Sequence, residues 1–190
     1  MHTTLPRRFY TDPDFYRAEV DRFFFTRWIC AGRADQIPRA GDYFTRTLGD
    51  ESLIITRDGS GALNALFNVC RHRGTRLCEE PEGHFVDRIQ CPYHSWTYDL
   101  EGRLLAAPQM APGFCKDEYP LHRAGCELWD GHIFVHLGAA ASTLAAPPAP
   151  PALIDQLQGL PERFAAWQMG DLLLGRRIGY DVKANWKLIV

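Results

Sequence analysis

The sequence predicts a mainly β protein with flanking helices, an α+β arrangement built around a small antiparallel β domain at residues 40–137. Short segments rich in β-branched and aromatic residues recur through this region, and turns with Gly, Asp or Pro separate them. The turns Gly49-Asp50 and 58–61 have the composition of hairpin connections. The strands expected from this pattern, including one just before the domain, are 28–31, 43–48, 53–57, 63–69, 88–91, 96–98 and 133–137.

Residues 1–39 form the predicted N-terminal helical segment. Apolar residues follow helical spacing over 12–27. Thr11 or Asp12 is placed to cap this helix, and Pro13 suits its first turn.

The region after the β domain divides into a linker and the beginning of a second domain. Residues 138–152 are rich in Ala and Pro, a composition typical of linkers. Residues 153–190 predict a helix over 153–167, interrupted near Pro161, and a strand over 172–182. The chain ends in an apolar run, so we expect this second domain to be incomplete and the native polypeptide to continue.

Composition excludes several classes of function. The 190 residues are 46% hydrophobic, enough for a core, and the net charge of −2 gives no electrostatic basis for binding nucleic acid or an anionic membrane. No apolar stretch approaches the length of a membrane span. Arg7-Arg8 resembles a twin-arginine signal, but no apolar segment follows it, so we predict a cytoplasmic protein.

Two Cys/His pairs stand out from this background: Cys70 with His72, and Cys91 with His94. Each pair lies at the end of a predicted strand, and 18 residues separate the two. Clustered Cys and His in a reducing compartment indicate metal binding rather than a disulfide framework. The other four cysteines have no His at ligand spacing and are expected to be small buried hydrophobes: Cys30, Cys78, Cys115 and Cys126.

The mixed composition of each pair favours iron over zinc. Structural zinc sites usually pair like with like, Cys-x-x-Cys followed by His-x(3–5)-His. One Cys and one His in each loop suit a two-iron cluster, with Cys70 and Cys91 on one iron and His72 and His94 on the other. A zinc-binding interaction module remains the alternative at this point.

The sequence around these residues resembles a known family. CRHRG at 70–74 and CPYHSW at 91–96 resemble the Rieske motif, and the surrounding sequence is similar to the α subunits of Rieske non-haem iron oxygenases. Similar pieces are WICAGRADQIPRAGDY at 28–43, EYPLH at 118–122 and DVKANWKLIV at 181–190. The resemblance implies a Rieske-type antiparallel β-sandwich with an N-terminal helix and the start of a catalytic domain.

The resemblance also implies a function. The [2Fe–2S] cluster would transfer electrons within an O₂- and NAD(P)H-dependent oxygenase that hydroxylates or oxidatively demethylates a small organic substrate. The motifs weakly favour quaternary-amine and similar monooxygenases over aromatic-ring dioxygenases. An NAD(P)H-dependent reductase or ferredoxin would be the electron donor, and the full-length protein would be a homotrimer. A stand-alone Rieske ferredoxin is the alternative, but such carriers lack the flanking segments found here.

A mononuclear non-haem Fe(II), which such oxygenases hold with two His and a carboxylate, is expected only beyond this chain. In the family, the segment resembling NWKLIV leads into the iron-binding histidines. His132 and His136 flank a predicted strand, where four residues span about 13 Å. They are therefore not expected to share a metal.

Four further residues belong to the expected surroundings of the cluster: Arg73, Tyr93, Ser95 and Trp96. The two aromatic side chains are expected to shield the cluster or simply to pack, and Arg73 to bond a neighbouring group or remain on the surface. By resemblance, high-potential Rieske proteins carry a disulfide between the positions of Thr75 and Tyr93, so this chain belongs to the lower-potential kind. Oxygenase subunits often have Gly at the position of Ser95, whose hydroxyl is a candidate for raising the potential through a hydrogen bond to a sulfide.

Overall fold

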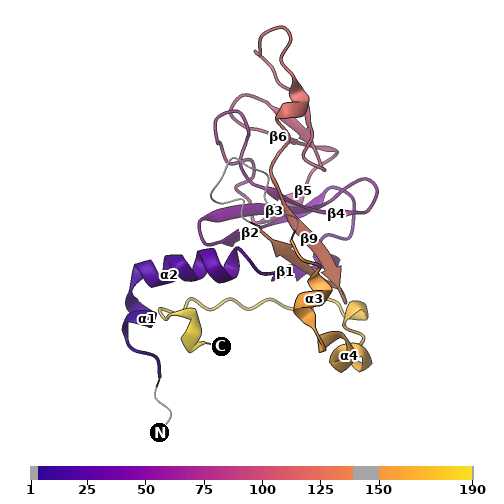
Figure 1. The fold of residues 1–190 in the computed structure, drawn as a ribbon. Coiled ribbons are helices and arrows are strands. Elements are labelled where there is room, and N and C mark those ends of the chain that lie inside the picture. Colours follow the sequence, from indigo (N-terminus) through magenta and orange to yellow (C-terminus); the bar gives the residue numbers. More distant parts are fainter. Residues whose placement is uncertain (1–3, 139–149, 190) are drawn as a thin grey trace.

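The computed structural model describes residues 4–138 and 150–189, and its centre is two antiparallel sheets (Figure 1). The larger sheet has the strand order β1-β10-β9-β4-β3-β2-β5, and the smaller has the order β6-β7-β8. The strands are β1 Ile29–Arg33, β2 Asp42–Leu48, β3 Glu51–Arg57, β4 Leu63–Phe67, β5 Glu82–His84, β6 Arg88–Gln90, β7 Thr97–Asp99, β8 Leu104–Ala106, β9 Arg123–Trp129 and β10 His132–His136.

Strand β3, next to the central strand β4 of the larger sheet, is buried on both faces and separates two cores. Because side chains alternate along a strand, Leu53 and Ile55 face one side while Ile54 faces the other. The first core includes Phe44 and Ile133 and is closed by residues of the N-terminal helix. The second core lies between the two sheets and contains Ile54, Leu66, Ile89 and Tyr98, together with Cys70 and Cys91. The cysteine of each predicted metal loop therefore lies in the second core.

The N-terminal helix forms where the sequence predicted it, with a change of winding in its second half. After a single turn, α1 Arg8–Thr11, the main helix α2 spans Pro13–Glu19 and continues as a π-helical turn, Val20–Phe24. The Asp12 side chain caps α2 by accepting a hydrogen bond from the Asp14 N–H at 2.8 Å. The wider π turn directs Val20 and Phe25 into the first core.

Strand prediction succeeded for most of the β domain and missed three strands. All seven expected segments contain or overlap an observed strand, and Gly49-Asp50 and 58–62 connect hairpins. The missed strands are β5, β8 and β9. β1 lies before residue 40, yet it pairs with β10 and belongs to the larger sheet.

The region after the linker differs most from expectation. Two short helices, α3 Leu153–Leu157 and α4 Leu160–Phe164, are separated at Gln158 and Gly159, just before Pro161, so the predicted interruption is present. Gln158 has a φ of 48°, which ends α3, while Pro161 lies in the first turn of α4, where proline is favoured. The linker residues 139–149 lie outside the described residues.

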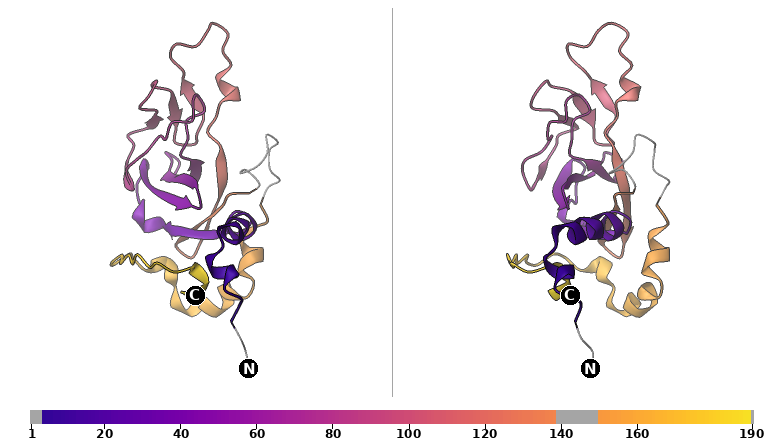
Figure 2. Two further views of the ribbon diagram at one scale, coloured as in Figure 1. Left: turned by 90° about the vertical axis from the view of Figure 1, so that its left-hand side faces the viewer. Right: turned by 60° about the vertical axis from the view of Figure 1, so that its left-hand side comes forward.

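The strand expected at 172–182 is wrong. The segment is extended but pairs with no strand in the part of the chain that the structure describes. It runs below the larger sheet towards α1 and α2 (Figures 1 and 2).

Polar contacts hold this C-terminal segment at both ends. At one end, Arg33 donates to the Met169 carbonyl at 3.0 Å and to the Leu172 carbonyl. At the other end, the Lys187 ammonium lies 2.6 and 2.7 Å from the two Glu19 carboxylate oxygens. The segment is thereby tied to β1 and to the N-terminal helix.

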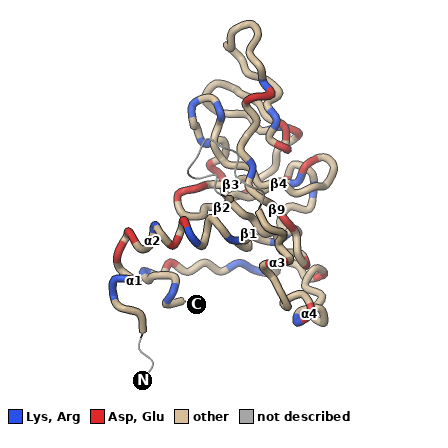
Figure 3. The backbone as a smooth tube through the Cα atoms, in the orientation of Figure 1, with Lys and Arg blue, Asp and Glu red and all other residues tan. Residues whose placement is uncertain are grey.

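No helix among the described residues is long and apolar enough to cross a membrane. Basic and acidic residues are scattered along the chain in Figure 3, and both signs occur in its upper and lower parts.

Candidate metal centre

The two predicted metal loops share one backbone design. In the first loop, the Cys70 N–H donates to the Thr75 carbonyl at 2.8 Å, and the Gly74 N–H donates to the Cys70 carbonyl at 3.0 Å. In the second loop, the Cys91 N–H donates to the Trp96 carbonyl at 2.8 Å, and the Ser95 N–H donates to the Cys91 carbonyl at 3.1 Å. Each loop is therefore closed between its cysteine and the residues four and five positions later.

The closure requires a left-handed residue at the fourth position after each cysteine. Gly74 has a φ of 73° and Ser95 a φ of 57°. Glycine adopts this conformation without steric cost, whereas serine does not. Ser95 therefore carries a backbone cost that Gly74 does not.

The four predicted ligands converge between these loops. Cys70 and Cys91 are each 2% exposed, and the rings of His72 and His94 lie with their centroids 4.7 Å apart. The Nδ1 atoms of both histidines are buried and have no hydrogen-bond partner among the described residues. Burying a polar atom without a hydrogen-bond partner costs free energy. Two such nitrogens side by side therefore indicate that the two rings bind another group. Both rings therefore present Nδ1 inward.

The protonation states suit metal binding. Burial lowers the pKa of His72, and its electrostatic interactions with His94 and Arg73 lower it further, which favours the neutral imidazole that binds a metal. Burial raises the pKa of the Cys70 thiol, and a hydrogen bond from Tyr98 opposes that rise. The Cys91 thiol lies beside that of Cys70 and also raises its pKa. Two adjacent buried thiols are stabilised as thiolates only by a cation.

The donor set fits a two-iron cluster better than a single ion. The histidines neighbour each other, and so do the cysteines, which matches one iron with two imidazoles and one with two thiolates. In the described ranges, no three His, Cys, Asp or Glu side chains are arranged to hold a single metal ion.

Tyr98 on β7 is a site residue that the sequence did not reveal. Its side chain is fully buried, and its hydroxyl lies 3.4 Å from the Cys70 Sγ and accepts a hydrogen bond from the Arg71 N–H at 3.1 Å. The hydroxyl therefore has its proton available for the sulfur. Its sequence position, seven residues after Cys91 in a strand, indicated only a core tyrosine.

The four residues expected around the cluster differ in burial. Trp96 is 1% exposed and stacks on His72, with ring centroids 4.8 Å apart and 7° between the planes. Tyr93 is 60% exposed, and its ring lies 3.7 Å from that of His94. Arg73 and Ser95 are exposed.

The remaining cysteines only partly follow expectation. Cys78 is buried, which raises the pKa of its thiol to about 11, and Cys126 is half-buried. Cys30 and Cys115 are exposed, contrary to prediction. Cys30 lies on edge strand β1 with its side chain away from the core, and Cys115 lies in the long connection between β8 and β9.

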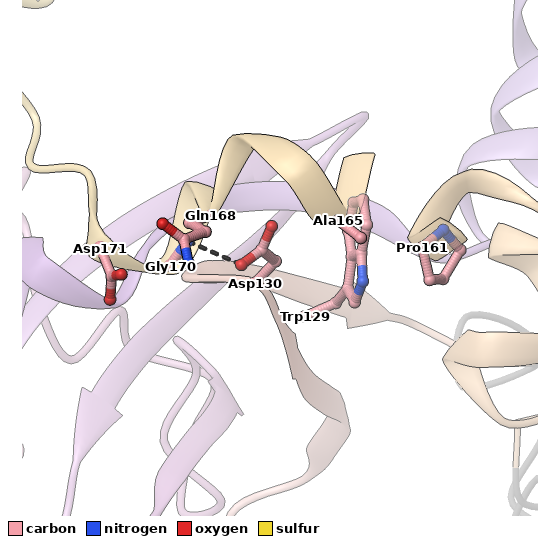
Figure 4. A pocket seen from close by; sticks show the side chains of 7 residues that line it. All are labelled: Trp129, Asp130, Pro161, Ala165, Gln168, Gly170 and Asp171. Carbon is pink, nitrogen blue, oxygen red and sulfur yellow. Dashed lines mark hydrogen bonds between the residues drawn. The ribbon is translucent and has the colours of Figure 1, made fainter. Parts of the chain in front are cut away.

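One pocket lies apart from the two loops, between the β9–β10 turn and the segment that follows α4 (Figure 4). It has a volume of about 470 Å³, and its residues include Trp129, Asp130 and Asp171. The Asp130 carboxylate accepts hydrogen bonds from the backbone N–H groups of Met169 and Gly170 at 3.2 and 2.7 Å. This carboxylate holds the chain in place, and none of the four predicted ligands lines the pocket.

The fold and the paired loops define the class of protein. The Rieske [2Fe-2S] domain family matches residues 27–129, and the chain belongs to this family. Its cofactor is a Rieske [2Fe–2S] cluster, as the Cys and His pattern predicted.

Within that family the chain is homologous to oxygenase subunits. The glycine betaine monooxygenase oxygenase subunit of Chromohalobacter salexigens is 36% identical over 188 residues, which are 98% of this chain and 40% of that subunit. The carnitine monooxygenase oxygenase subunit of Escherichia coli K12 is 34% identical over 191 residues, 98% of this chain and 48% of that subunit. The chain therefore spans half the length of these relatives or less.

Solved structures agree in fold. The quaternary ammonium Rieske monooxygenase CntA, in its apo form, matches with a TM-score of 0.86 and 31% identity over 98% of this chain and 52% of that one. Naphthalene 1,2-dioxygenase from Rhodococcus sp. matches with a TM-score of 0.70 and 29% identity over 83% of this chain and 34% of that one. The mainly β fold with short flanking helices is thus confirmed.

Proposed function

We propose that the chain is the electron-transferring front part of a Rieske non-haem iron oxygenase subunit. Cys70 and Cys91 hold one iron of the cluster, and His72 and His94 hold the other through their inward Nδ1 atoms. The observation that carries this assignment is the pair of buried, unpartnered Nδ1 nitrogens beside two buried thiols. The bound cluster supplies a one-electron couple, and neutral imidazole ligands place its potential above that of four-thiolate clusters.

The arrangement of the ligands gives the electron a direction. The two thiols lie in the second core, and that of Cys70 is next to Tyr98, whereas both histidines are only half-buried and His94 lies beside the exposed Tyr93 ring. With Nδ1 turned inward, the Nε2 atoms of His72 and His94 point away from the cluster. The histidine side is therefore the exit towards an acceptor.

In the whole protein, this acceptor is a mononuclear non-haem Fe(II) in the catalytic domain that residues 153–190 begin. The overall reaction is O₂-dependent hydroxylation or oxidative demethylation of a small organic substrate. Relatives that act on glycine betaine and carnitine make a quaternary ammonium compound the favoured substrate class. Similarity over 98% of the chain includes both flanks, which supports an oxygenase subunit over a stand-alone carrier.

The proposed partners follow from the same assignment. An NAD(P)H-dependent reductase or a ferredoxin donates electrons, and the full-length protein is a homotrimer in the cytoplasm. Electron transfer in the quaternary ammonium Rieske monooxygenase CntA is inter-subunit, which supports an assembly of several subunits here.

The test is reduction by a physiological type of donor. The anaerobically purified chain is mixed with NADH and the reductase of a carnitine monooxygenase, and bleaching of the cluster absorbance is followed. We expect two irons and two acid-labile sulfides per chain and bleaching that requires both NADH and reductase. His72→Ala should lose the iron and sulfide, whereas the control His132→Ala, on β10, should retain them. A colourless preparation that contains zinc and resists iron–sulfur reconstitution would contradict the proposal.

A further inference from the structure

Trp96 connects the two metal loops, because its backbone and its side chain belong to different ones. Its carbonyl closes the second loop by accepting the Cys91 N–H at 2.8 Å. Its indole ring reaches the first loop and lies parallel to the His72 ring, with 7° between the planes and 4.8 Å between the centroids. A displacement of this ring would therefore change the setting of a ligand in the other loop.

The indole ring also contacts two aromatic rings that lie outside the metal loops. Phe114 and Tyr119 contact it edge-on, with centroids 5.5 and 5.8 Å away, and these two rings pack on each other at 4.7 Å. Both belong to the connection between β8 and β9, which projects at the top of Figure 1. Trp96 is only 1% exposed, so it has little room to change rotamer.

The two histidines are consequently held to different degrees. The His72 ring has the buried, buttressed Trp96 on one face, and the His94 ring against its edge. The His94 ring instead contacts the ring of Tyr93, which is 60% exposed and inclined by 39° to it. His72 is thus the fixed ligand and His94 the adaptable one.

We propose that Trp96 is a positioning residue for electron transfer, one that fixes the ring plane of His72 and so keeps its Nδ1 inward and its Nε2 outward. This inference rests on the proposed function, since it assigns a role at the same site. A fixed imidazole reduces the rearrangement that accompanies each change of oxidation state, and the buttress from Phe114 and Tyr119 maintains it. Plain core packing predicts no selectivity between the two histidines.

The test compares Trp96→Phe and Trp96→Leu with Trp129→Phe, a matched change of an aromatic residue outside the site. In reduced protein labelled with ¹⁵N-histidine, electron–nuclear double resonance reads the nitrogens coupled to the cluster. We expect Trp96→Leu to shift and broaden one of the two nitrogen couplings and leave the other unchanged, with Trp96→Phe intermediate and Trp129→Phe like the wild type. Equal changes in both couplings, or none in a variant with full cluster content, would overturn the role.

A second readout needs no cluster and separates this role from the proposed function. In the metal-free chain, the His72 ring protons, assigned by comparison with His72→Gln, should move downfield in Trp96→Leu because the stacked indole no longer shields them. The His94 ring protons should stay in place. If both ring signals remain unchanged, the stacking role is wrong even where the wild type assembles its cluster. If the shift appears but the wild type never binds iron, the proposed function fails and the stacking contact stands.

Discussion

Gly74 and Ser95 occupy the same position in the two metal loops. Each donates its N–H to the carbonyl of the cysteine four residues earlier, at 3.0 and 3.1 Å, and each has a positive φ. Only Gly74 suits that backbone without cost, because a left-handed conformation is unfavourable for residues with a Cβ atom. The second loop therefore carries strain that the first does not.

Ser95→Gly should relieve this strain. We expect the free energy of unfolding to rise by up to about 1 kcal/mol, the usual cost of a left-handed non-glycine residue. Urea unfolding of the metal-free chain, followed by circular dichroism, measures it. Gly74→Ala is the matched control in the other direction. A Cβ at Gly74 would meet nothing within 4 Å, so its loss of about 1 kcal/mol would be conformational and not steric. A destabilised Ser95→Gly would contradict the equivalence of the loops.

Tyr98→Phe should lower the midpoint potential of the cluster. The tyrosine hydroxyl lies 3.4 Å from the Cys70 Sγ, and a donor to a ligating sulfur favours the reduced, more negative state. A hydrogen bond worth about 1 kcal/mol corresponds to about 40 mV for one electron. Redox titration followed by visible circular dichroism measures the shift.

One control variant and one further test variant accompany that titration. Tyr180→Phe, at an exposed tyrosine of the extended C-terminal segment, should leave the potential unchanged. Ser95→Ala tests the other hydroxyl: if it bonds a sulfide, the potential falls, and an unchanged potential refutes that tuning role. An unchanged potential in Tyr98→Phe would mean that the tyrosine only packs.

Glu19→Gln should loosen the C-terminal segment from the N-terminal helix. The Glu19 carboxylate binds the Lys187 ammonium and accepts the Trp186 indole N–H at 3.1 Å, and the two charged side chains are 13% and 14% exposed. We expect the free energy of unfolding to fall by about 2 kcal/mol, a loss between those typical of buried and of surface ion pairs. Urea unfolding measures the loss, and an altered tryptophan emission of the folded chain reports the released indole. Asp21→Asn, an exposed change on the same helix, should alter neither quantity.

Asp58 should make stability depend on acid pH. Burial alone would raise its pKa, but hydrogen bonds from Ser60, Asn64 and the Ala62 N–H outweigh burial and lower it. A carboxyl with a lowered folded pKa stabilises the protein fully above its unfolded pKa, about 3.9, and this stabilisation is lost as the pH falls through the folded pKa.

The corresponding variant is Asp58→Asn, studied by urea unfolding at several pH values. It should be less stable than the wild type by about 1–2 kcal/mol at pH 7, and the difference should shrink below pH 3.9. Asp50→Asn, in the exposed β2–β3 turn, should stay within about 0.5 kcal/mol of the wild type throughout. A stability difference that does not change with pH would contradict the charged hydrogen-bond network.

The sequence predicted what depends on local pattern. Cys70, His72, Cys91 and His94 could be found because ligand chemistry and turn residues are local properties, and β3 because its apolar run fills two cores. β5 was missed because Glu82, Gly83 and His84 are all exposed and only pairing with β2 makes them a strand. β9 was missed because its Arg, Gly and Glu break the apolar alternation.

The errors share a dependence on distant contacts. The alternation of Ile178, Tyr180 and Val182 has the period of a strand, but a strand also needs a partner, which sequence pattern cannot supply. Tyr98 acquires its place at the site through the approach of Cys70, 28 residues away. Trp96 was expected near the cluster, but its stacking on His72 depends on how the two loops meet.

The most direct test of the central claim is pulsed electron paramagnetic resonance of the anaerobically purified, dithionite-reduced chain with ¹⁵N-labelled histidine. The account predicts a reduced [2Fe–2S] signal coupled to two histidine nitrogens. One coupling should disappear in His72→Cys and the other in His94→Cys, while His132→Ala retains both. A signal without histidine coupling, or coupling that survives both ligand substitutions, would contradict the assignment of His72 and His94.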